Sequence, residues 1–174
     1  YGALVIHPRG GPEPVDRDMV LVLSDWIDEA SEEVMRMLKR GSGYYALKKG
    51  TVPSLAGAIR AGAVGEVFRQ WWDRMPPMDI SDVAYDRFLI NGQTESFLEA
   101  RPGETIRLRI INASASTYFY VQSGAGPLRL TAADGLAVEP VEIDRLLLAV
   151  AETYDVLIRM PDHPAALEIR ATSQ

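Results

Sequence analysis

The sequence contains no cysteine and only two histidines, His7 and His163. Without thiols the chain can form neither a disulfide bond nor a thiolate metal site, and a blue-copper centre needs a cysteine beside two histidines. Each histidine precedes a proline in loop-like sequence. Because one imidazole alone fixes no metal geometry, we interpret both as solvated loop residues and not as copper-loading ligands.

Long apolar runs and an excess of positive charge are also absent. No stretch approaches the roughly 20 apolar residues that span a bilayer, and no secretory leader is visible. The net charge of -6 argues against nucleic acid or an acidic membrane as a partner. The chain opens directly on strand-like sequence, Tyr1-Gly2-Ala3-Leu4-Val5-Ile6, so we expect it to be a segment of a longer protein.

Turn signals separate short runs that favour strands. The Asn-Gly and Asp-Gly pairs tolerate positive φ and are typical of hairpins, and a Pro-Gly pair favours a type II turn. These signals are Asn91-Gly92, Asp134-Gly135 and Pro102-Gly103. The strands that they delimit are expected at residues 3–6, 19–23, 85–90, 106–110, 118–121, 128–132, 146–150, 154–160 and 167–171.

Residues 106–110 alternate between apolar and basic side chains, which indicates a half-buried antiparallel strand. Arg107 and Arg109 occupy its polar face, where carboxylates or solvent would satisfy them. The run 19–23 is continuously apolar and predicts a strand buried on both faces. The predicted inner core is Ile106, Leu108, Ile110, Phe119, Val121, Val156 and Ile158. Together these patterns predict an antiparallel β-sandwich over about residues 16–174.

Residues 28–79 interrupt the strands with helical sequence. Glu32 and Glu33 fall in a first turn, where the helix dipole favours anions, and Lys39-Arg40 complement the last turn. Residues 53–75 form a second, glycine-weakened helical region. We therefore expect a helical insertion between β elements.

Several motifs together resemble the middle cupredoxin-like domain of a multicopper oxidase, most closely the copper-resistance protein A group. They are Leu23-Ser24-Asp25-Trp26, Ile90-Asn91-Gly92-Gln93-Thr94, Arg101-Pro102-Gly103-Glu104, residues 107–114, Ala133-Asp134-Gly135 and residues 150–156. The resemblance implies a cupredoxin-like Greek-key β-sandwich flanked by other cupredoxin domains of the same chain. It also implies that residues 1–15 are the last strand of a preceding domain plus a linker, and that the protein is periplasmic.

Enzymes of this family oxidise phenols or cuprous ion and reduce dioxygen to water. Their copper ligands are His-X-His pairs and a His-Cys-His stretch in the first and last domains. Neither motif occurs here. The resemblance therefore implies no copper in this segment and copper in the parent protein, so we expect the isolated chain to be catalytically silent.

The loop of residues 112–118 is the candidate site. In laccase relatives the corresponding loop reaches toward the type 1 copper and can carry an acid that accepts the substrate's proton. Here it offers the hydroxyl groups of Ser114, Ser116 and Thr117 and no carboxylate. A hydroxyl is no base near neutral pH without activation, so we expect the loop to line the substrate cleft without supplying the acid. An ordinary polar loop tip is the alternative.

Two other functions remain open. Thioether sulfur suits Cu(I), so Met75 and Met78, with Met35 and Met37, could form a copper-binding module together with histidine. Methionine also fills ordinary cores, and Met35 and Met37 diverge on a helix. A free-standing β-sandwich that binds carbohydrate or protein is the second alternative.

The remaining polar residues suggest structural roles. Asp134, Glu152 and Asp155 are interpreted as turn and strand-end residues and not as a catalytic acid pair. Asn112 begins a glycosylation-type triplet, but we expect its amide to bond local backbone.

Overall fold

The computed structural model describes residues 2–7, 9–11, 13–40, 55–60, 62–65 and 83–173. The chain divides into two compact units, Tyr1–Trp26 with Arg87–Gln174, and Ile27–Asp86. Among the described residues, every strand belongs to the first unit and every helix to the second. The helical insertion expected at residues 28–79 falls within the range of the second unit.

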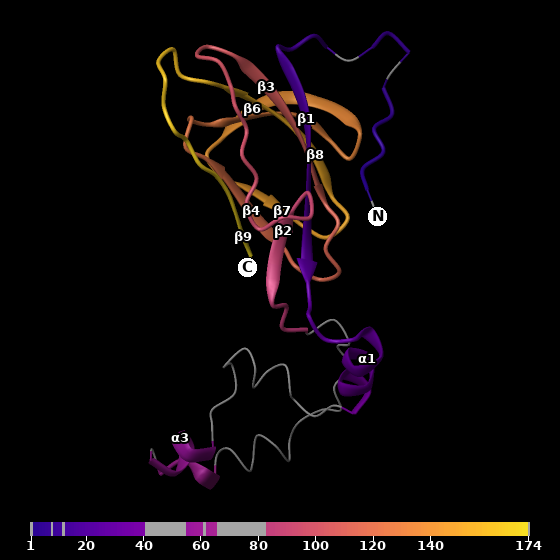
Figure 1. The fold of residues 1–174 in the computed structure, drawn as a ribbon, viewed down its shortest axis with the longest axis vertical. Coiled ribbons are helices and arrows are strands. Elements are labelled where there is room, and N and C mark those ends of the chain that lie inside the picture. The colour runs from indigo at the N-terminus through magenta and orange to yellow at the C-terminus, as the bar shows by residue number, and fades with distance from the viewer. Residues whose placement is uncertain are drawn as a thin grey trace. The chain divides into compact units, whose positions relative to one another are not determined.

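The first unit is built from two sheets, whose strands Figure 1 shows. The larger has the order β2-β1-β3-β8-β5-β6 and the smaller the order β7-β4-β9. The bounds are β1 Arg17–Trp26, β2 Arg87–Ile90, β3 Thr105–Asn112, β4 Phe119–Ser123, β5 Leu128–Ala133, β6 Leu136–Ile143, β7 Leu146–Leu148, β8 Thr153–Arg159 and β9 Ile169–Ser173. The β-sandwich class is confirmed.

One pairing corrects the expectation of an antiparallel fold. β1 and β3 run parallel, with Met19 beside Leu108 and Leu21 beside Ile110, whereas the other described pairs are antiparallel. Parallel neighbours need a long connection between them. Residues 27–104, which include the helical unit and β2, provide it. Local patterning cannot reveal this, because alternation looks the same in either orientation.

The turn predictions are confirmed. Asn91 and Gly92 have φ of 51° and 82°, and Asp134 and Gly135 have φ of 47° and 77°, as two-residue hairpins require. Gly103 has a φ of 74°, and the amide of Glu104 donates to the carbonyl of Arg101 at 3.1 Å, as in a type II turn. The sequence therefore located these three chain reversals correctly.

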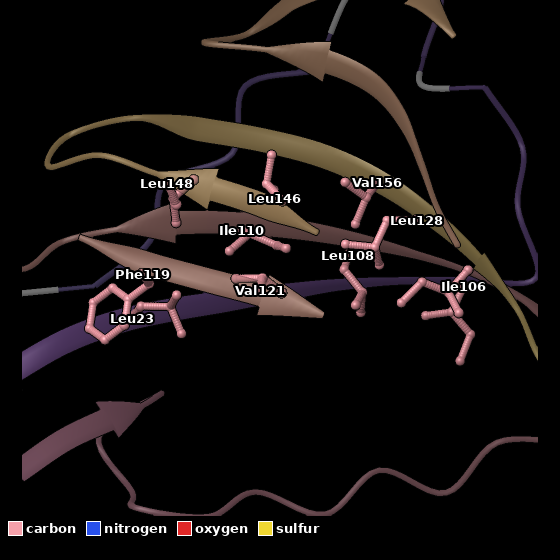
Figure 2. Packing of buried hydrophobic residues seen from close by; sticks show 11 residues of the cluster. Leu23, Ile106, Leu108, Ile110, Phe119, Val121, Leu128, Leu146, Leu148 and Val156 are labelled. Carbon is pink, nitrogen blue, oxygen red and sulfur yellow. The ribbon is translucent and has the colours of Figure 1, made fainter. Parts of the chain in front are cut away.

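The core lies between the two sheets and matches the predicted one. All seven predicted residues are at most 2% exposed. Figure 2 shows their side chains gathered with neighbours from β1, β5 and β7. The additional members are Leu23, Leu128, Leu146 and Leu148.

Three expectations about strands need correction. Residues 3–6 form no strand, and Leu4 and Ile6 are 84% and 85% exposed, because no neighbouring strand pairs with them here. β1 is not buried on both faces, since Val20 and Val22 are half-buried. β6 was not expected. It contains Pro140, which is tolerated because β6 is the edge of its sheet, where proline costs no ladder bond.

The helical unit contains α1, Ser31–Arg40, and α3, Leu55–Arg60. The first helix agrees with the prediction, with Glu32 and Glu33 in its first turn. Val83 and Ala84 are buried and are covered by side chains that include Val34 and Met37. Much of the second predicted helical region lies outside the described residues.

Candidate functional site

Residues 112–118 cross from one sheet to the other, and we call them the crossing loop. They run from the last residue of β3 in the six-stranded sheet to the residue before β4 in the three-stranded sheet. The apolar alternation of β3 ends here, and polar residues follow. The loop therefore contains all three hydroxyl residues of the predicted site.

Asn112 organises the loop from within. Its side chain is 1% exposed, and its Nδ2 donates to the carbonyls of Thr117 at 2.9 Å and Leu148 at 3.2 Å. Its Oδ1 accepts from the Ser114 amide at 3.0 Å. These bonds satisfy a buried amide that would otherwise be costly. The prediction that Asn112 bonds local backbone is confirmed.

Two of the three candidate hydroxyl residues are buried, Ser114 at 5% and Thr117 at 8% exposure. Ser114 Oγ lies 2.6 Å from Asn112 Oδ1 and 2.7 Å from the Thr117 carbonyl oxygen, so its proton is bonded inside the loop. Thr117 Oγ1 donates to Asp25 at 3.1 Å. Both hydroxyl groups therefore shape the loop.

Asp25 holds the loop from β1. The amide of Ala115 donates to its Oδ1 at 3.1 Å and its Oδ2 at 3.0 Å, and the amide of Ser116 donates to Oδ2 at 3.3 Å. Together with Thr117, these groups place backbone and side-chain donors around one carboxylate. Local sequence patterns do not link Asp25 to the loop, because the contact joins residues about ninety positions apart.

Ser116 is half-buried, and exposed aromatic surface lies beside the loop. Tyr118 is 46% exposed at the end of the loop. Phe88 of β2 is 38% exposed and packs edge-on against Phe119, with ring centroids 5.7 Å apart. Tyr118 and Phe88 thus leave aromatic surface partly exposed at the loop and at the strand that contacts it.

The basic face of β3 carries a network of ion pairs. Arg109 binds Asp18 at 2.7 Å and Asp155 at 2.8 Å, and Arg107 reaches Asp18 at 3.3 Å and the carbonyl of Glu13 at 2.8 Å. The hydrogen bond from Arg109 lowers the pKa of Asp18, whereas burial raises the pKa of Asp155. The expectation that carboxylates satisfy these arginines is confirmed.

The acidic residues weighed as a catalytic pair each have a structural partner. Asp134 accepts from the Thr153 amide at 2.8 Å, and Glu152 accepts from the Ala149 amide at 2.7 Å. Burial raises the pKa of Tyr154, and the charges of Glu152 and Asp134 add to this effect. Turn and strand-end chemistry thus accounts for these carboxylates.

The metal-ligand candidates do not converge in the part of the chain described. His7 and His163 are both exposed, and the described residues hold no group of three or more His, Cys, Asp or Glu side chains placed to bind a metal ion. Met37 packs in the helical unit, while Met35 is 45% exposed. Met75 and Met78 lie outside the described residues.

The described residues include no helix with the length and apolar character to cross a membrane.

A mixed β-sandwich of six and three strands, with a loop crossing between its sheets, defines a cupredoxin-like domain. The solved multicopper oxidase Fet3p, which functions in iron import, matches 93% of this chain and 24% of its own with a TM-score of 0.65 at 16% identity. At that identity the likeness establishes the fold alone.

The sequence pattern of the multicopper oxidase family matches residues 17–174, so the chain belongs to this family. It is 41% identical over 172 residues to copper resistance protein A of Escherichia coli, covering 91% of this chain and 28% of that protein. The corresponding protein of Pseudomonas syringae pv. tomato is 40% identical over 169 residues, with the same coverage of 91% and 28%. The chain thus spans under a third of the length of these relatives.

A type 1 copper site does not fit the residues of this chain. Its equatorial ligands are two histidines and a cysteine thiolate, and the chain has no cysteine. No reaction step through copper is therefore assigned to these residues.

Proposed function

We propose that this chain is the middle domain of a periplasmic multicopper oxidase of the copper-resistance type and that its crossing loop lines the substrate cleft. The parent enzyme would remove single electrons from phenols or cuprous ion. Four such electrons and four protons convert one dioxygen to two waters. The copper ligands would come from flanking cupredoxin domains, and this domain would bind and orient the substrate.

The hydrogen-bond network of the crossing loop is the observation that carries this proposal. Asn112 bonds the loop from within, and Asp25 bonds it from β1. A loop whose polar groups are fixed in this way can present Ser116 and Tyr118 in one arrangement, which is what a binding surface needs.

The segment before β1 supports a preceding domain. Leu4 and Ile6 are exposed, and together with Val5 they line a cavity of about 320 Å³ that also contacts Arg107 and Arg109 on the outer face of the larger sheet. The apolar side chains of Leu4 and Ile6 thus form an edge that this chain leaves uncovered. We propose that residues 1–15 are the last strand of a preceding domain plus a linker, in which a neighbouring strand covers this edge.

The test is kinetic and uses the full oxidase that contains this chain. Ser116→Asp adds a carboxylate at the half-buried loop position, so it should change the KM for 2,6-dimethoxyphenol and the pH dependence of its oxidation. The copper content and the thermal midpoint should stay close to those of the parent. Ser116→Ala is the matched control for loss of the hydroxyl group alone.

Ser123→Asp provides a second control, because Ser123 lies at the far end of β4. It should leave the kinetics unchanged. If Ser116→Asp and Ser116→Ala both have the parent's KM and pH profile, the crossing loop does not line the cleft and the proposal is wrong.

A further inference from the structure

Asp25 connects the crossing loop to a strand that no local sequence pattern links to it. An ionised carboxylate only accepts hydrogen bonds. The amides of Ala115 and Ser116 and the hydroxyl of Thr117 all donate to it, at 3.0 to 3.3 Å. Hydrogen bonds to a charged acceptor are stronger than neutral ones, so this carboxylate restrains three successive loop residues at once.

The register of β1 and β2 strengthens this restraint. Asp25 pairs with Phe88 across the two strands. Phe88 packs at 87° against the ring of Phe119, the first residue of β4. One pair of neighbouring residues therefore contacts both the middle of the loop and the residue that follows it. The next pair, Trp26 with Arg87, is the last of this ladder.

We infer that Asp25 is a positioning residue for substrate binding. It fixes the backbone of residues 115–117 and thereby sets where Ser116 stands in the cleft. This inference rests on the proposed function. In this role both oxygens of Asp25 accept hydrogen bonds from the loop, and Asp25 acts on the substrate through the position of Ser116.

Asp25→Asn tests this role, because it keeps the shape of the side chain but turns an NH₂ group toward hydrogen-bond donors. Asp16→Asn is the matched control. Asp16 precedes the other end of β1 and accepts from the amide of Thr105 at 2.8 Å. The two sites are about 30 Å apart at the usual rise per strand residue. Thr117→Val is a milder second variant that removes one donor without changing the shape.

Amide hydrogen exchange in this chain is the first measurement. Asp25→Asn should speed exchange at Ala115 and Ser116 by about tenfold or more, with little change at Leu108. Asp16→Asn should speed exchange at Thr105 and leave the loop unchanged. Thr117→Val should act in the same direction as Asp25→Asn and less strongly. Unchanged exchange at Ala115 and Ser116 in both loop variants would overturn the inference.

Kinetics of the full oxidase are the second measurement. Asp25→Asn should raise the KM for 2,6-dimethoxyphenol by about threefold or more, while kcat and its pH profile stay those of the parent. A fall in kcat with an altered pH profile would instead make Asp25 a proton acceptor and overturn the positioning role. If the Ser116 variants change KM and Asp25→Asn does not, this inference fails alone; if none changes it, the proposed function fails with it.

Discussion

The inner core and the crossing loop are both buried, but different forces stabilise them. Leu108, 1% exposed, is surrounded by aliphatic side chains from two sheets, and its burial requires only apolar area and volume. Asn112 is equally buried, but four neighbouring groups must point at specific atoms of its amide. The core should therefore tolerate changes of shape that conserve volume, and the loop should not tolerate even an isosteric change.

The largest effect is expected from a cavity in the core. Leu108→Ala removes buried methyl groups between the sheets and should cost about 2–5 kcal/mol of unfolding free energy. Urea denaturation of the chain measures this as a lower midpoint. Leu147→Ala is the control, because Leu147 is 46% exposed and its loss should be small. An unchanged midpoint for Leu108→Ala would place this residue outside the core.

A nearly isosteric change in the loop should cost almost as much. Asn112→Asp replaces the Nδ2 donor with an oxygen that faces the carbonyls of Thr117 and Leu148. The mismatch should destabilise the chain by about 2–3 kcal/mol, and less at low pH where the new acid is protonated. The denaturation midpoint at neutral and acidic pH measures both effects. A midpoint equal to the parent's would show that the hydrogen bonds of the Asn112 amide do not stabilise the loop.

The ion pairs on the outer face of β3 should make a smaller contribution to stability, and this contribution depends on pH. The pKa of Asp18 is lowered from 3.8, mainly by the hydrogen bond from Arg109. Its stabilisation is therefore fully present above pH 3.8 and is lost as the pH falls through the lower pKa of the folded state. Asp18→Asn should cost about 1 kcal/mol at neutral pH and make the loss of stability in acid less steep.

The pKa of Asp155 is shifted in the opposite direction to that of Asp18. Burial raises its pKa, so its charge costs stability at neutral pH and this cost is relieved as the pH falls. Asp155→Asn should therefore leave the acid limb as steep as in the parent, or steeper. Stability measured by urea titration between pH 2 and 7 compares the two variants. If both variants made the loss of stability in acid less steep by the same amount, the opposite directions of the two pKa shifts would be contradicted.

A small effect is expected from a volume-conserving core change. Leu108→Met keeps an apolar side chain of similar size and should cost less than about 1.5 kcal/mol. Set beside Asn112→Asp, it tests the comparison directly, since both variants conserve volume at buried positions. If Leu108→Met costs more than Asn112→Asp under the same conditions, the distinction between the two regions is wrong.

The sequence by itself determined the local geometry and the apolar face of the fold. Asn91-Gly92 and Asp134-Gly135 permit positive φ, and the alternation of Ile106, Leu108 and Ile110 marks the side that leaves water. These features depend on neighbours a few residues away. They therefore identified the sandwich and its core, whereas the hydroxyl groups of the crossing loop were proposed from the resemblance to laccases.

Only the tertiary structure decided which distant segments meet. β1 pairs with β3 in parallel, and the Ser116 amide donates to Asp25; both contacts join residues far apart along the chain. The edge position of β6, which permits Pro140, likewise depends on the order of the strands. Such contacts depend on strand order and on directional hydrogen bonds, which local periodicity does not encode. The hydrogen bonds of Ser114 and Thr117 are directional contacts of this kind, so only the structure showed them.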